Sequence, residues 1–369
     1  MELKMHFGRA AFSALAAALA AGSLIAAAPA SAETMLTSYS NIKLDSDIFG
    51  LVAPHSQPDI DLSNPWGMAY SPSGPFWVAD NNTGLATIYN GEGAKQGLVV
   101  SIPGGGGQPA NPTGQVFNGD SSAFVVSSNG ASGAALFILD GEDGGISGWS
   151  PSVNGSSAIL AVDNSNNGWD GAVYKGLEIV TSGSSPVLLA TNFHSGWVEE
   201  YSSTWAKIGS FRPTDIPAGF APFNVRDLNG TIYVTFAKQD TAKHDEVLGP
   251  SLGIIETLDL STGTFTDFAR GGVLNAPWGI AIAPSDFGAA SGDLLVGNFG
   301  SGQIHAFNPT TGALDGVLAD PGGKPVFLPG LWALDFGNGS GAGPKDWLYY
   351  TSGRFNEAHG LFGYLVTGP

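Results

Sequence analysis

The chain has 369 residues and no cysteine, which excludes disulfide bonds, thiol chemistry and zinc–thiolate sites. Its formal net charge of −18 at pH 7 argues against nucleic acid and anionic lipid as partners, because both require a basic surface. Glycine (54 residues) and proline (23 residues) are abundant, yet hydrophobic residues make up 43% of the chain. This combination is typical of many short strands joined by tight turns, not of a disordered chain.

The N-terminal segment has the features of an export signal. Basic side chains at positions 4 to 9 precede an apolar run over residues 10–28, and Ala30-Ser31-Ala32 fits the cleavage motif of small residues. We therefore expect residues 1–32 to be removed as a signal peptide, which leaves 33–369 as a single domain in the periplasm or outside the cell. No later segment reaches the roughly 18 consecutive apolar residues of a membrane span, so none is expected after cleavage.

A strand–turn–strand pattern recurs along the rest of the chain. Apolar residues lead into an Asp or Asn, a glycine follows four residues later, and an aromatic residue follows five after that. The copies are WVADNNTGLATIY, FILDGEDGGISGW, LATNFHSGWVEEY and LVGNFGSGQIHAF, which begin at residues 77, 137, 189 and 295. The glycine permits a tight turn and the aromatic ring packs on the sheet face. Two looser copies begin at Thr231 and Asp346.

Another strand precedes each hairpin, and in most copies a further strand follows it. Six units of four strands predict an all-β fold, a six-bladed β-propeller. The innermost strands are expected at WGMAYSP, TGQVFNG, KGLEIVT, FNVRDLN, WGIAIAP and LWALDFG. No fourth strand follows in the last unit, so we expect the segment Met35 to Asp45 to complete that blade and close the ring. An edge strand left unpaired would promote aggregation.

Several longer phrases resemble those of one protein family. They include VYKGLEI, TNFHSG, YVTFAKQDTAKHDEVLGP and LLVGNFGSGQIHAFNPTTG. The family is an uncharacterised group of secreted bacterial NHL-like six-bladed propellers, and the resemblance covers essentially the whole chain after the signal. It implies the fold and export but no activity, because none is established for the family. Many of its members end in a surface-sorting tail, which is absent from this sequence.

Propeller geometry predicts where a binding site would lie. Loops that lead into the innermost strands share one face with the turns between second and third strands, and ligands usually bind there. The candidates for catalysis at this channel mouth are His194 and His244. The candidates for ligand binding are Trp66, Asp80, Asn82, Asn192, Lys238, Asp240, Asp245, Trp278, Asn298, Arg354 and Glu357. The tryptophans would supply stacking surface and the polar side chains hydrogen bonds.

The repeated Asp and Asn of the turns have two interpretations. Each side chain of the set Asp80, Asp140, Asn192 and Asn298 hydrogen-bonds backbone amides of its own turn, as such residues commonly do. Alternatively, they supply oxygen ligands to a calcium ion at the channel mouth.

The histidines also have two interpretations each. The loop from Ala237 to Pro250 is long and places His244 near several carboxylates and lysines. These side chains would bind a metal or provide a general base. Alternatively, they form a solvated charged loop without a specific function. His194 replaces the Asn, Glu or Gly of the other copies and is either functional or an exposed turn residue. Arg354 would clamp a carboxylate or phosphate, or pair with nearby acids.

Three functions remain open at this point. The first is binding of a small molecule, glycan or protein at the channel mouth. The second is a calcium-dependent hydrolase of the lactonase or phosphoesterase type, with a channel-mouth metal and His194 or His244 as base. The third is a structural role in the cell envelope. A calcium hydrolase would need carboxylates repeated on the innermost strands, and their absence from the sequence favours binding, with enzymatic activity left undecided.

Overall fold

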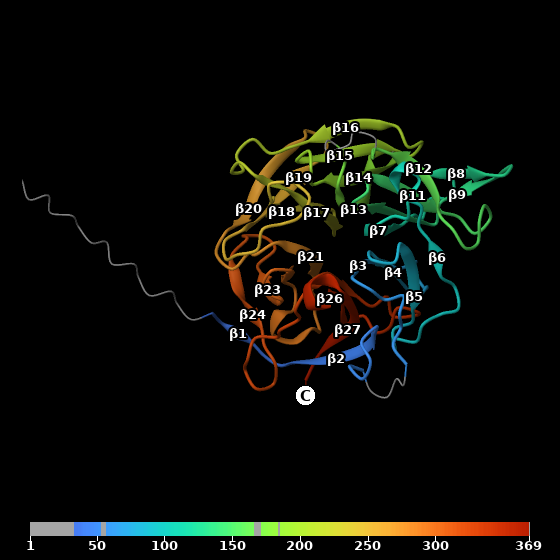
Figure 1. The fold of residues 1–369 in the computed structure, drawn as a ribbon. Helices are drawn as coiled ribbons and strands as arrows, with labels where there is room; N and C mark the ends of the chain where they lie inside the picture. Colours follow the sequence, from blue (N-terminus) through green and yellow to red (C-terminus); the bar gives the residue numbers. More distant parts are fainter. Residues whose placement is uncertain (1–32, 53–56, 166–170, 184, 369) are drawn as a thin grey trace, which may run out of the picture. The chain divides into compact units, whose positions relative to one another are not determined.

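The repeated strand–turn–strand patterns form antiparallel hairpins, and each hairpin belongs to one of six small sheets. A computed structural model describes residues 33–52, 57–165, 171–183 and 185–368. Within the unit Thr34–Pro369, six sheets surround one axis, which confirms the predicted six-bladed β-propeller (Figure 1). Among the described residues, no helix has the length and apolar character needed to cross a membrane.

The first three blades follow one another along the chain. Blade 1 contains β3 (Pro65–Ala69), β4 (Phe76–Asp80), β5 (Leu85–Tyr89) and β6 (Val100–Ser101). Blade 2 contains β7 (Pro112–Phe117), β10 (Phe137–Gly141), β11 (Gly145–Trp149) and β12 (Ile159–Asp163), and carries the separate hairpin β8 (Val125–Ser128) and β9 (Ala131–Ala134). Blade 3 contains β13 (Tyr174–Ser182), β14 (Ser185–Asn192), β15 (Trp197–Ser202) and β16 (Lys207–Phe211).

The other three blades complete the ring. Blade 4 contains β17 (Phe220–Leu228), β18 (Thr231–Lys238), β19 (Gly253–Asp259) and β20 (Thr264–Arg270). Blade 5 contains β21 (Pro277–Ile282), β22 (Leu294–Asn298), β23 (Gln303–Phe307) and β24 (Leu314–Leu318). Blade 6 contains β25 (Leu331–Phe336), β26 (Leu348–Gly353), β27 (His359–Thr367) and β2 (Tyr39–Ser46). Short helical turns are η1 (Gly105–Gly107), η3 (Gly288–Ala290) and α1 (Arg354–Glu357).

Strand β2 closes the ring as predicted. It pairs antiparallel with β27, from Tyr39 opposite Thr367 to Ser46 opposite Leu361. The preceding residues differ from the prediction, because β1 (Met35–Leu36) pairs parallel with β24 and extends blade 5 by a fifth strand. The N-terminal segment therefore joins two blades, since its two strands belong to neighbouring sheets.

The Pro-Trp-Gly motif has a packing role at the propeller axis. Trp66 stacks on Trp332 with ring centroids 3.4 Å apart, and Trp278 meets both rings edge-on at 5.9 Å. Trp66 of blade 1 also contacts Phe223 of the opposite blade 4, at 6.5 Å between centroids. Because rings from opposite blades touch, this aromatic plug fills the channel at that level.

The glycine after each motif tryptophan lets neighbouring innermost strands approach. A Cβ on Gly67 would lie 2.5 Å from the carbonyl oxygen of Thr113 in the next blade, and one on Gly279 would lie 2.3 Å from that of Trp332. Both distances are below any tolerable contact, so a side chain at either position would push two blades apart.

Candidate functional site

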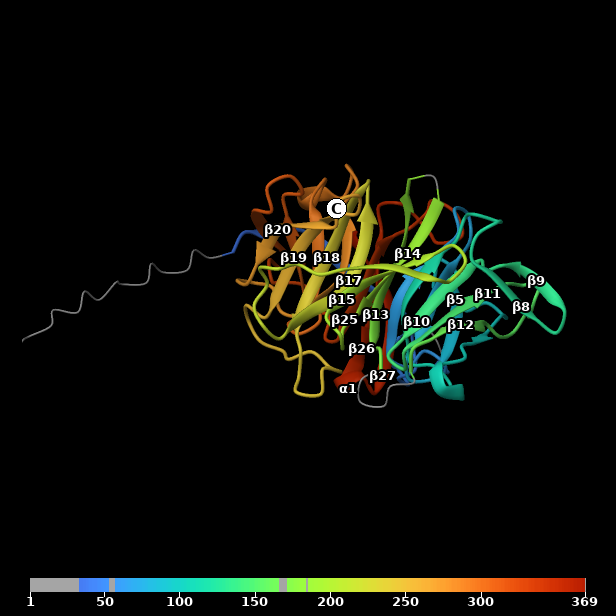
Figure 2. The same ribbon diagram turned by 90° about the horizontal axis from the view of Figure 1, so that it is seen from above.

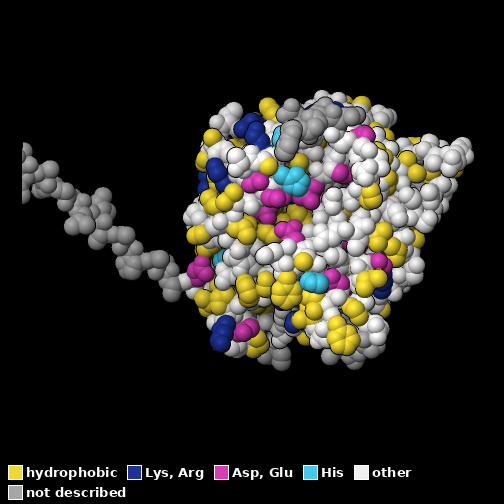
Figure 3. Space-filling model, in the orientation of Figure 1, with side chains coloured by type: hydrophobic (Ala, Val, Ile, Leu, Met, Phe, Trp, Pro, Cys, Tyr) yellow, Lys and Arg dark blue, Asp and Glu magenta, His cyan; other side chains and the backbone are white. Residues whose placement is uncertain are grey.

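One face of the propeller collects the turns between second and third strands together with α1. In the side view, α1 lies at the edge of the ring that forms this face (Figure 2). Near the centre of the same face, acidic side chains gather with histidine around a hollow (Figure 3). We refer to this region as the acidic mouth, defined by Glu142, Lys175, His244, Asp245, Glu246 and Glu357.

Lys175 forms the base of the acidic mouth. It belongs to the innermost strand β13 and its side chain is fully buried (0% exposed). The ammonium group contacts a carboxylate oxygen of Glu142, lies 3.9 Å from Oδ1 of Asp245 and sits 4.9 Å from the ring centroid of Trp66. Burial lowers the pKa of Lys175, but the surrounding carboxylates outweigh burial and raise it above its usual value. A charged lysine therefore rests on the aromatic plug and faces the mouth.

The carboxylates around Lys175 outnumber it. Glu142 Oε2 accepts a hydrogen bond from Asn81 Nδ2 at 3.0 Å, and Glu357 Oε2 accepts one from Asn64 Nδ2 at 3.0 Å. Burial raises the pKa of Glu246 to about 7, against an opposing effect of Lys175, and also raises the pKa of Glu357. The mouth thus holds carboxyl groups whose negative charge is incompletely balanced.

His244 and Asp245 form a hydrogen-bonded pair at the rim. Nδ1 of His244 lies 2.8 Å from Oδ1 of Asp245, and this bond raises the pKa of the histidine and lowers that of the aspartate. The imidazole is 46% exposed, so its other nitrogen is available to a ligand. This is an arrangement in which a carboxylate orients a histidine for proton transfer.

A cavity of about 470 Å³ lies beside this pair. It is lined by Glu142, Asp143, His194, Asp240, His244 and Asp245, with Ser165, Ala242 and residues 171–173. The blade 4 loop reaches the turn of blade 3 because Gln239 Nε2 donates to the carbonyl oxygens of Phe193, at 2.5 Å, and His194, at 3.3 Å. The structure therefore brings together the two histidines that the sequence proposed as catalytic, while their role stays a prediction.

The metal hypothesis can be tested on the residues themselves. Among the described residues, one group of possible ligands was found, Glu142, His244 and Asp245, whose ligand atoms lie within 4.8 Å of one another. Calcium takes six to eight oxygen ligands. Here one of three donors is nitrogen, and the Lys175 ammonium already contacts Glu142 and lies near Asp245. These residues do not fit calcium, because a fixed positive charge stands where the ion would be bound.

The tryptophans predicted to stack on a ligand are buried. Trp66 is 1% exposed and Trp278 is 4% exposed, and the indole N–H of Trp278 donates to the carbonyl oxygen of Lys175 at 3.0 Å. The prediction of ligand-stacking surface is therefore wrong for both, because Trp66 is covered by Trp332 and the Lys175 ammonium, and Trp278 packs edge-on against Trp66 and Trp332. Without these platforms, the glycan interpretation loses its main argument.

The repeated turn residues are also corrected as ligand-binding candidates. Asp80 and Asn298 are 0% exposed and Asn192 is 5% exposed. Oδ1 of Asn298 accepts from the backbone N–H of Asn275 at 2.8 Å, and Oδ1 of Asp140 accepts from that of Gly114 at 2.7 Å. Asp140 therefore reaches the innermost strand β7, and Asn298 reaches the segment that leads into the innermost strand β21, rather than the residue's own turn. Oδ1 of Asn192 accepts both from the backbone N–H of Val173, which precedes the innermost strand, at 3.4 Å, and from that of Ser195 in its own turn, at 3.1 Å.

The third strand of the blade often supplies a side-chain hydrogen-bond partner for the turn residue. Asp80 accepts from Thr87 Oγ1 at 2.7 Å, Asn192 Nδ2 donates to Glu199 at 3.1 Å, and Asn298 Nδ2 lies 3.1 Å from Nδ1 of His305. Each partner follows seven residues after the turn residue. Asn192 and Asn298 therefore link the second strand of the blade to the third strand and to the segment that leads into the innermost strand, and this scaffold role accounts for their burial.

The remaining candidates lie at or near the mouth. Asn82 is exposed and its Nδ2 donates to the carbonyl oxygen of Glu357 at 2.7 Å. Asp240 Oδ1 accepts from the backbone N–H of His244 at 2.9 Å and so shapes the loop. Lys238 donates to the carbonyl oxygen of Ala218 at 2.9 Å and does not line the cavity. Arg354 lines a neighbouring hollow of about 300 Å³.

That hollow is more apolar than the mouth. Its lining includes the side chains of Leu248, Phe299, Phe327 and Phe355. Leu248, Phe327 and Phe355 are 50%, 65% and 66% exposed, so the rim offers uncovered apolar surface. The turn of α1 between the two hollows holds Phe355, Asn356 and Glu357 at φ of 53°, 53° and 63°, a strained conformation for residues other than glycine.

Three residues of the acidic mouth were not among the site candidates proposed from the sequence. Lys175 and Glu142 were within quoted phrases but were not proposed, and Glu246 was noted only as part of its loop. A lysine inside an otherwise apolar innermost strand is the signal that could have revealed Lys175, because a buried charge requires a partner.

Comparisons with known proteins support the fold but identify no function. No family model matches the chain. The chain is 27% identical to an uncharacterised protein of Acanthamoeba polyphaga mimivirus over 328 residues, which cover 86% of this chain and 83% of the relative. It is 29% identical to a second uncharacterised protein of the same virus over 290 residues, which cover 76% of this chain and 70% of that relative. These relatives are viral, whereas the sequence resemblance pointed to bacterial proteins. The secreted and NHL-like parts of that resemblance stay predictions.

Solved structures agree on the propeller. The soluble aldose sugar dehydrogenase from Escherichia coli, in its apo form, matches 90% of this chain and 100% of its own length with a TM-score of 0.53 and 12% identity. A streptogramin B lyase matches 91% and 100% with a TM-score of 0.51 and 10% identity. At this identity the likeness shows the fold alone, since propellers host unrelated activities.

Proposed function

We propose that the protein binds a small molecule that carries a cationic group and an apolar group, with the cation in the acidic mouth. The observation that carries this proposal is the excess of carboxylates over the one buried ammonium. Glu142, Asp245, Glu246 and Glu357 surround Lys175, and the pKa of Glu246 is raised to about 7 because burial outweighs that one positive charge. A ligand cation would supply the missing positive charge.

The apolar part of the ligand would lie in the adjoining hollow. Leu248 belongs to the same loop as His244, and Phe355 precedes Glu357 by two residues, so charged and apolar surfaces are continuous along two segments. The strained turn at Phe355–Glu357 supports a binding role, because such conformations concentrate at functional sites. A small molecule suits these dimensions better than a glycan, which would need accessible aromatic faces.

Titration calorimetry with three compounds of matched shape tests the proposal. 2-Phenylethylamine carries the cation, 2-phenylethanol is neutral and 3-phenylpropionate is an anion. We expect only the amine to bind measurably at pH 7.5, with proton release as Glu246 ionises. Glu246→Gln should weaken amine binding at least about fivefold, which corresponds to roughly 1 kcal/mol for one ionic contact.

Asp259→Asn provides the matched control, because it removes one carboxylate from the exposed end of β19. It should leave amine binding unchanged, which separates a local contact from the overall negative charge. Equal binding of all three compounds, or equal weakening by both variants, would remove the proposal.

The His244–Asp245 pair favours a second candidate, hydrolysis of a lactone or phosphoester with His244 as general acid–base. Its support is the 2.8 Å bond that orients the imidazole beside the cavity. The streptogramin B lyase and the sugar dehydrogenase with the same fold supply only the precedent of a propeller that carries catalysis. Turnover of lactone and phosphoester panels that is lost in His244→Ala but kept in His194→Ala would establish it, and absence of turnover would remove it.

Export stays part of the proposal. The expected signal peptide, residues 1–32, lies outside the described residues. The periplasmic or extracellular location and the envelope role therefore rest on the sequence alone. An envelope role gives no reason for a charged lysine buried beneath four carboxylates.

A further inference from the structure

The buried residue Asn64 connects the aromatic plug to the acidic mouth. It directly precedes the Pro-Trp-Gly motif of blade 1 and is 2% exposed. Its Oδ1 accepts from the indole N–H of Trp332 at 3.1 Å, and its Nδ2 donates to Oε2 of Glu357 at 3.0 Å. These two bonds fix the amide, because a flipped amide would place its oxygen against the carboxylate of Glu357. Asn64 therefore holds one oxygen of Glu357 in place.

The backbone at this position does not require an asparagine. Asn64 has a φ of 49°, and the equivalent residues of blades 5 and 6, Ala276 and Gly330, have φ of 48° and 73°. Alanine thus adopts the same conformation before the Pro-Trp-Gly motif of blade 5. The turn does not explain the amide of Asn64, whose bonds lead to the plug and to the mouth.

Three carboxylates of the mouth keep a free oxygen. Within the described part of the chain, Oε1 of Glu357 and Oδ2 of Asp245 have no hydrogen-bond partner. The carboxylate of Glu246 is bonded only by its own backbone N–H. Burial raises the pKa of Glu246, and the negative charges of Glu357 and Asp245 raise it further. The three carboxylates therefore lie close enough to act on one another, and none of their side chains is fully buried.

The fourth carboxylate of the mouth is already engaged on both sides. One oxygen of Glu142 contacts the ammonium of Lys175, and the other accepts from Nδ2 of Asn81 at 3.0 Å. The buried lysine is thus paired with Glu142, and the free acceptors of the mouth belong to Asp245, Glu246 and Glu357.

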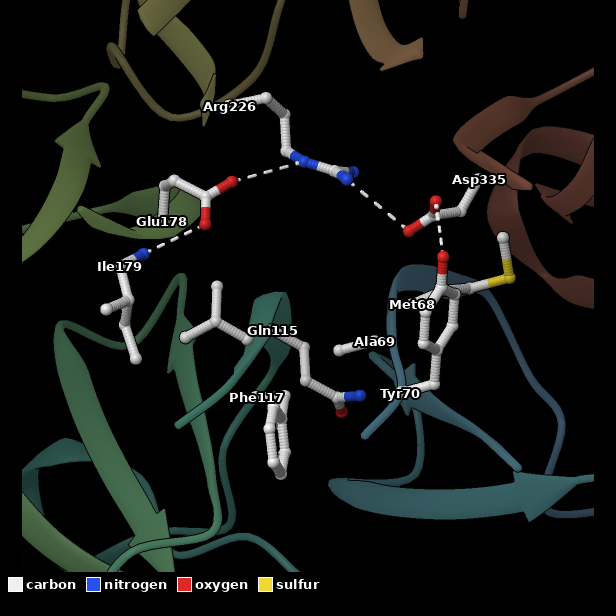
Figure 4. A pocket seen from close by; sticks show the side chains of 10 residues that line it. Met68, Ala69, Tyr70, Gln115, Phe117, Glu178, Ile179, Arg226 and Asp335 are labelled. Atoms are coloured by element: carbon white, nitrogen blue, oxygen red, sulfur yellow. Dashed lines mark hydrogen bonds and ion pairs between the residues drawn. The ribbon is translucent and has the colours of Figure 1, made fainter. Parts of the chain in front are cut away.

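The opposite end of the propeller axis carries a second pocket, which we call the rear pocket. It has a volume of about 300 Å³ and is lined by the distal parts of five innermost strands: Met68, Ala69 and Tyr70; Gln115, Val116 and Phe117; Glu178 and Ile179; Arg226; and Asp335 (Figure 4). None of these residues lines the acidic mouth, and the aromatic plug lies between the two levels of the same strands.

The carboxylates of the rear pocket have protein partners that those of the mouth lack. Arg226 Nε lies 3.3 Å from Oε2 of Glu178, and its Nη2 lies 3.4 Å from Oδ2 of Asp335 (Figure 4). Glu178 also accepts from the backbone N–H of Ile179 at 3.0 Å, and Asp335 from that of Phe336. A ligand cation would compete with a guanidinium and a backbone donor at each carboxylate of the rear pocket, whereas the mouth offers free acceptors.

We propose that the cation taken by the mouth is a primary ammonium group, whose N–H groups are accepted by Asp245, Glu246 and Glu357, with Asn64 as the positioning residue of Glu357. This inference rests on the binding function proposed above and names the class of its ligand. A primary ammonium carries three N–H donors, one for each carboxylate with a free oxygen.

A quaternary ammonium group suits the mouth less well. It has no N–H donor and is commonly recognised over aromatic faces. Trp66 is buried, and the exposed ring of Phe355 already faces the guanidinium of Arg354 at 5.8 Å. The mouth therefore offers carboxylate oxygens where a quaternary ammonium would need open aromatic faces.

A methylation series tests the inference on the whole chain by titration calorimetry at pH 7.5. 2-Phenylethylamine and its N-methyl, N,N-dimethyl and N,N,N-trimethyl derivatives carry the same charge, while their N–H donors fall from three to none. We expect affinity to fall along the series by at least about tenfold in total. Equal or tighter binding of the trimethyl compound would overturn the primary ammonium but leave cation binding intact. Absence of binding by all four compounds would remove the proposed function as well.

Asn64→Ala tests the positioning role. It removes the bond to Glu357 but no charge, so the preference for the primary over the trimethyl compound should fall at least about threefold. Burial raises the pKa of Glu357 and the bond from Asn64 opposes that rise. Amine binding in the variant should therefore develop at higher pH than in the natural protein, as titrations between pH 5 and 8 would measure. The other charged groups that act on Glu357 are Glu142, Lys175, Asp245 and Glu246.

Asn118→Ala is the matched control. Asn118 is 3% exposed and donates to the backbone carbonyl oxygens of Ala123 and Ala135 in blade 2. Its replacement should lower stability without changing the preference or the pH profile. Thermal unfolding compares the two variants. If Asn64→Ala fails to fold, Glu357→Gln replaces it, because a neutral acceptor should reduce the same preference. An unchanged preference in Asn64→Ala, or an equal loss in Asn118→Ala, contradicts the positioning role.

Discussion

The acidic mouth and the rear pocket lie on the same axis but are built in different ways. The mouth and the cavity beside it take most of their groups from loops: Glu142 and His194 from hairpin turns, His244 to Glu246 from the long blade 4 loop, and Glu357 from α1. The rear pocket takes nearly all of its groups from the innermost strands themselves (Figure 4). Lys175 is the exception in the mouth, because it belongs to β13.

This difference teaches how each site is held. Loop residues are positioned by a few hydrogen bonds, such as those from Gln239 to the turn of blade 3, so they tolerate replacement and adapt to a ligand. Strand residues are fixed by the sheet register, so the rear pocket is rigid. The aromatic plug keeps the two regions separate.

The largest effect is expected from breaking the plug. Trp332→Ala removes a fully buried ring that stacks on Trp66 and Phe299 and should lower the free energy of unfolding by about 3–5 kcal/mol. Urea denaturation measures the loss. Phe327→Ala, at an exposed ring, serves as the control and should change stability by less than about 0.5 kcal/mol. Similar small losses in both variants would show that the plug does not stabilise the axis.

Removal of the buried lysine should have the next largest effect. Lys175→Met leaves Glu142 without its cation and should cost about 2–4 kcal/mol in unfolding free energy, since an uncompensated buried charge is strongly destabilising. The double variant Lys175→Met with Glu142→Gln should recover most of that loss. Equal denaturation midpoints for the single and double variants would show that the pair does not act as a unit.

The rear pocket should respond to pH through Glu178. Burial raises the pKa of Glu178 to about 7 in the folded protein, above the usual value of 4.5, so the folded state binds the proton more tightly. Its contribution to stability is therefore present below pH 4.5 and is lost as pH rises toward 7. Glu178→Gln should make the fall in unfolding free energy across this window shallower, by at most about 1.4 kcal/mol per pH unit. Denaturation curves between pH 4.5 and 7.5 compare the slopes, and identical slopes contradict this assignment.

The smallest effects on stability are expected from the two histidines of the mouth. His194→Ala and His244→Ala should change the free energy of unfolding by less than about 0.5 kcal/mol, because neither side chain is buried. Amine binding at the mouth should nevertheless be impaired in both variants, and any turnover should be lost in His244→Ala. Thermal unfolding together with the amine titrations checks both statements. A large loss of stability in either variant would identify that histidine as part of the scaffold.

Much of the fold could be predicted from local sequence patterns. Turn residues, alternating apolar positions and the strand before each hairpin gave the six blades, because the turn chemistry repeats in each copy. The closing strand β2 followed from the missing partner of β27. The convergence of His194 with the His244 loop followed from blade geometry. The second pairing of the N-terminal segment, through Met35 and Leu36, had no comparable signal.

The sequence by itself determined the number of blades, the order of their strands and the face on which the hairpin turns lie, because these depend on short-range periodicity and turn residues. Only the tertiary structure decided that Trp66 and Trp278 fill the axis instead of facing a ligand, because their burial requires aromatic rings from several blades to meet. It also decided that Lys175 faces one opening while Glu178 and Arg226, on equivalent strands, face the other. Position along an innermost strand becomes depth in the channel only after six sheets have closed into a ring.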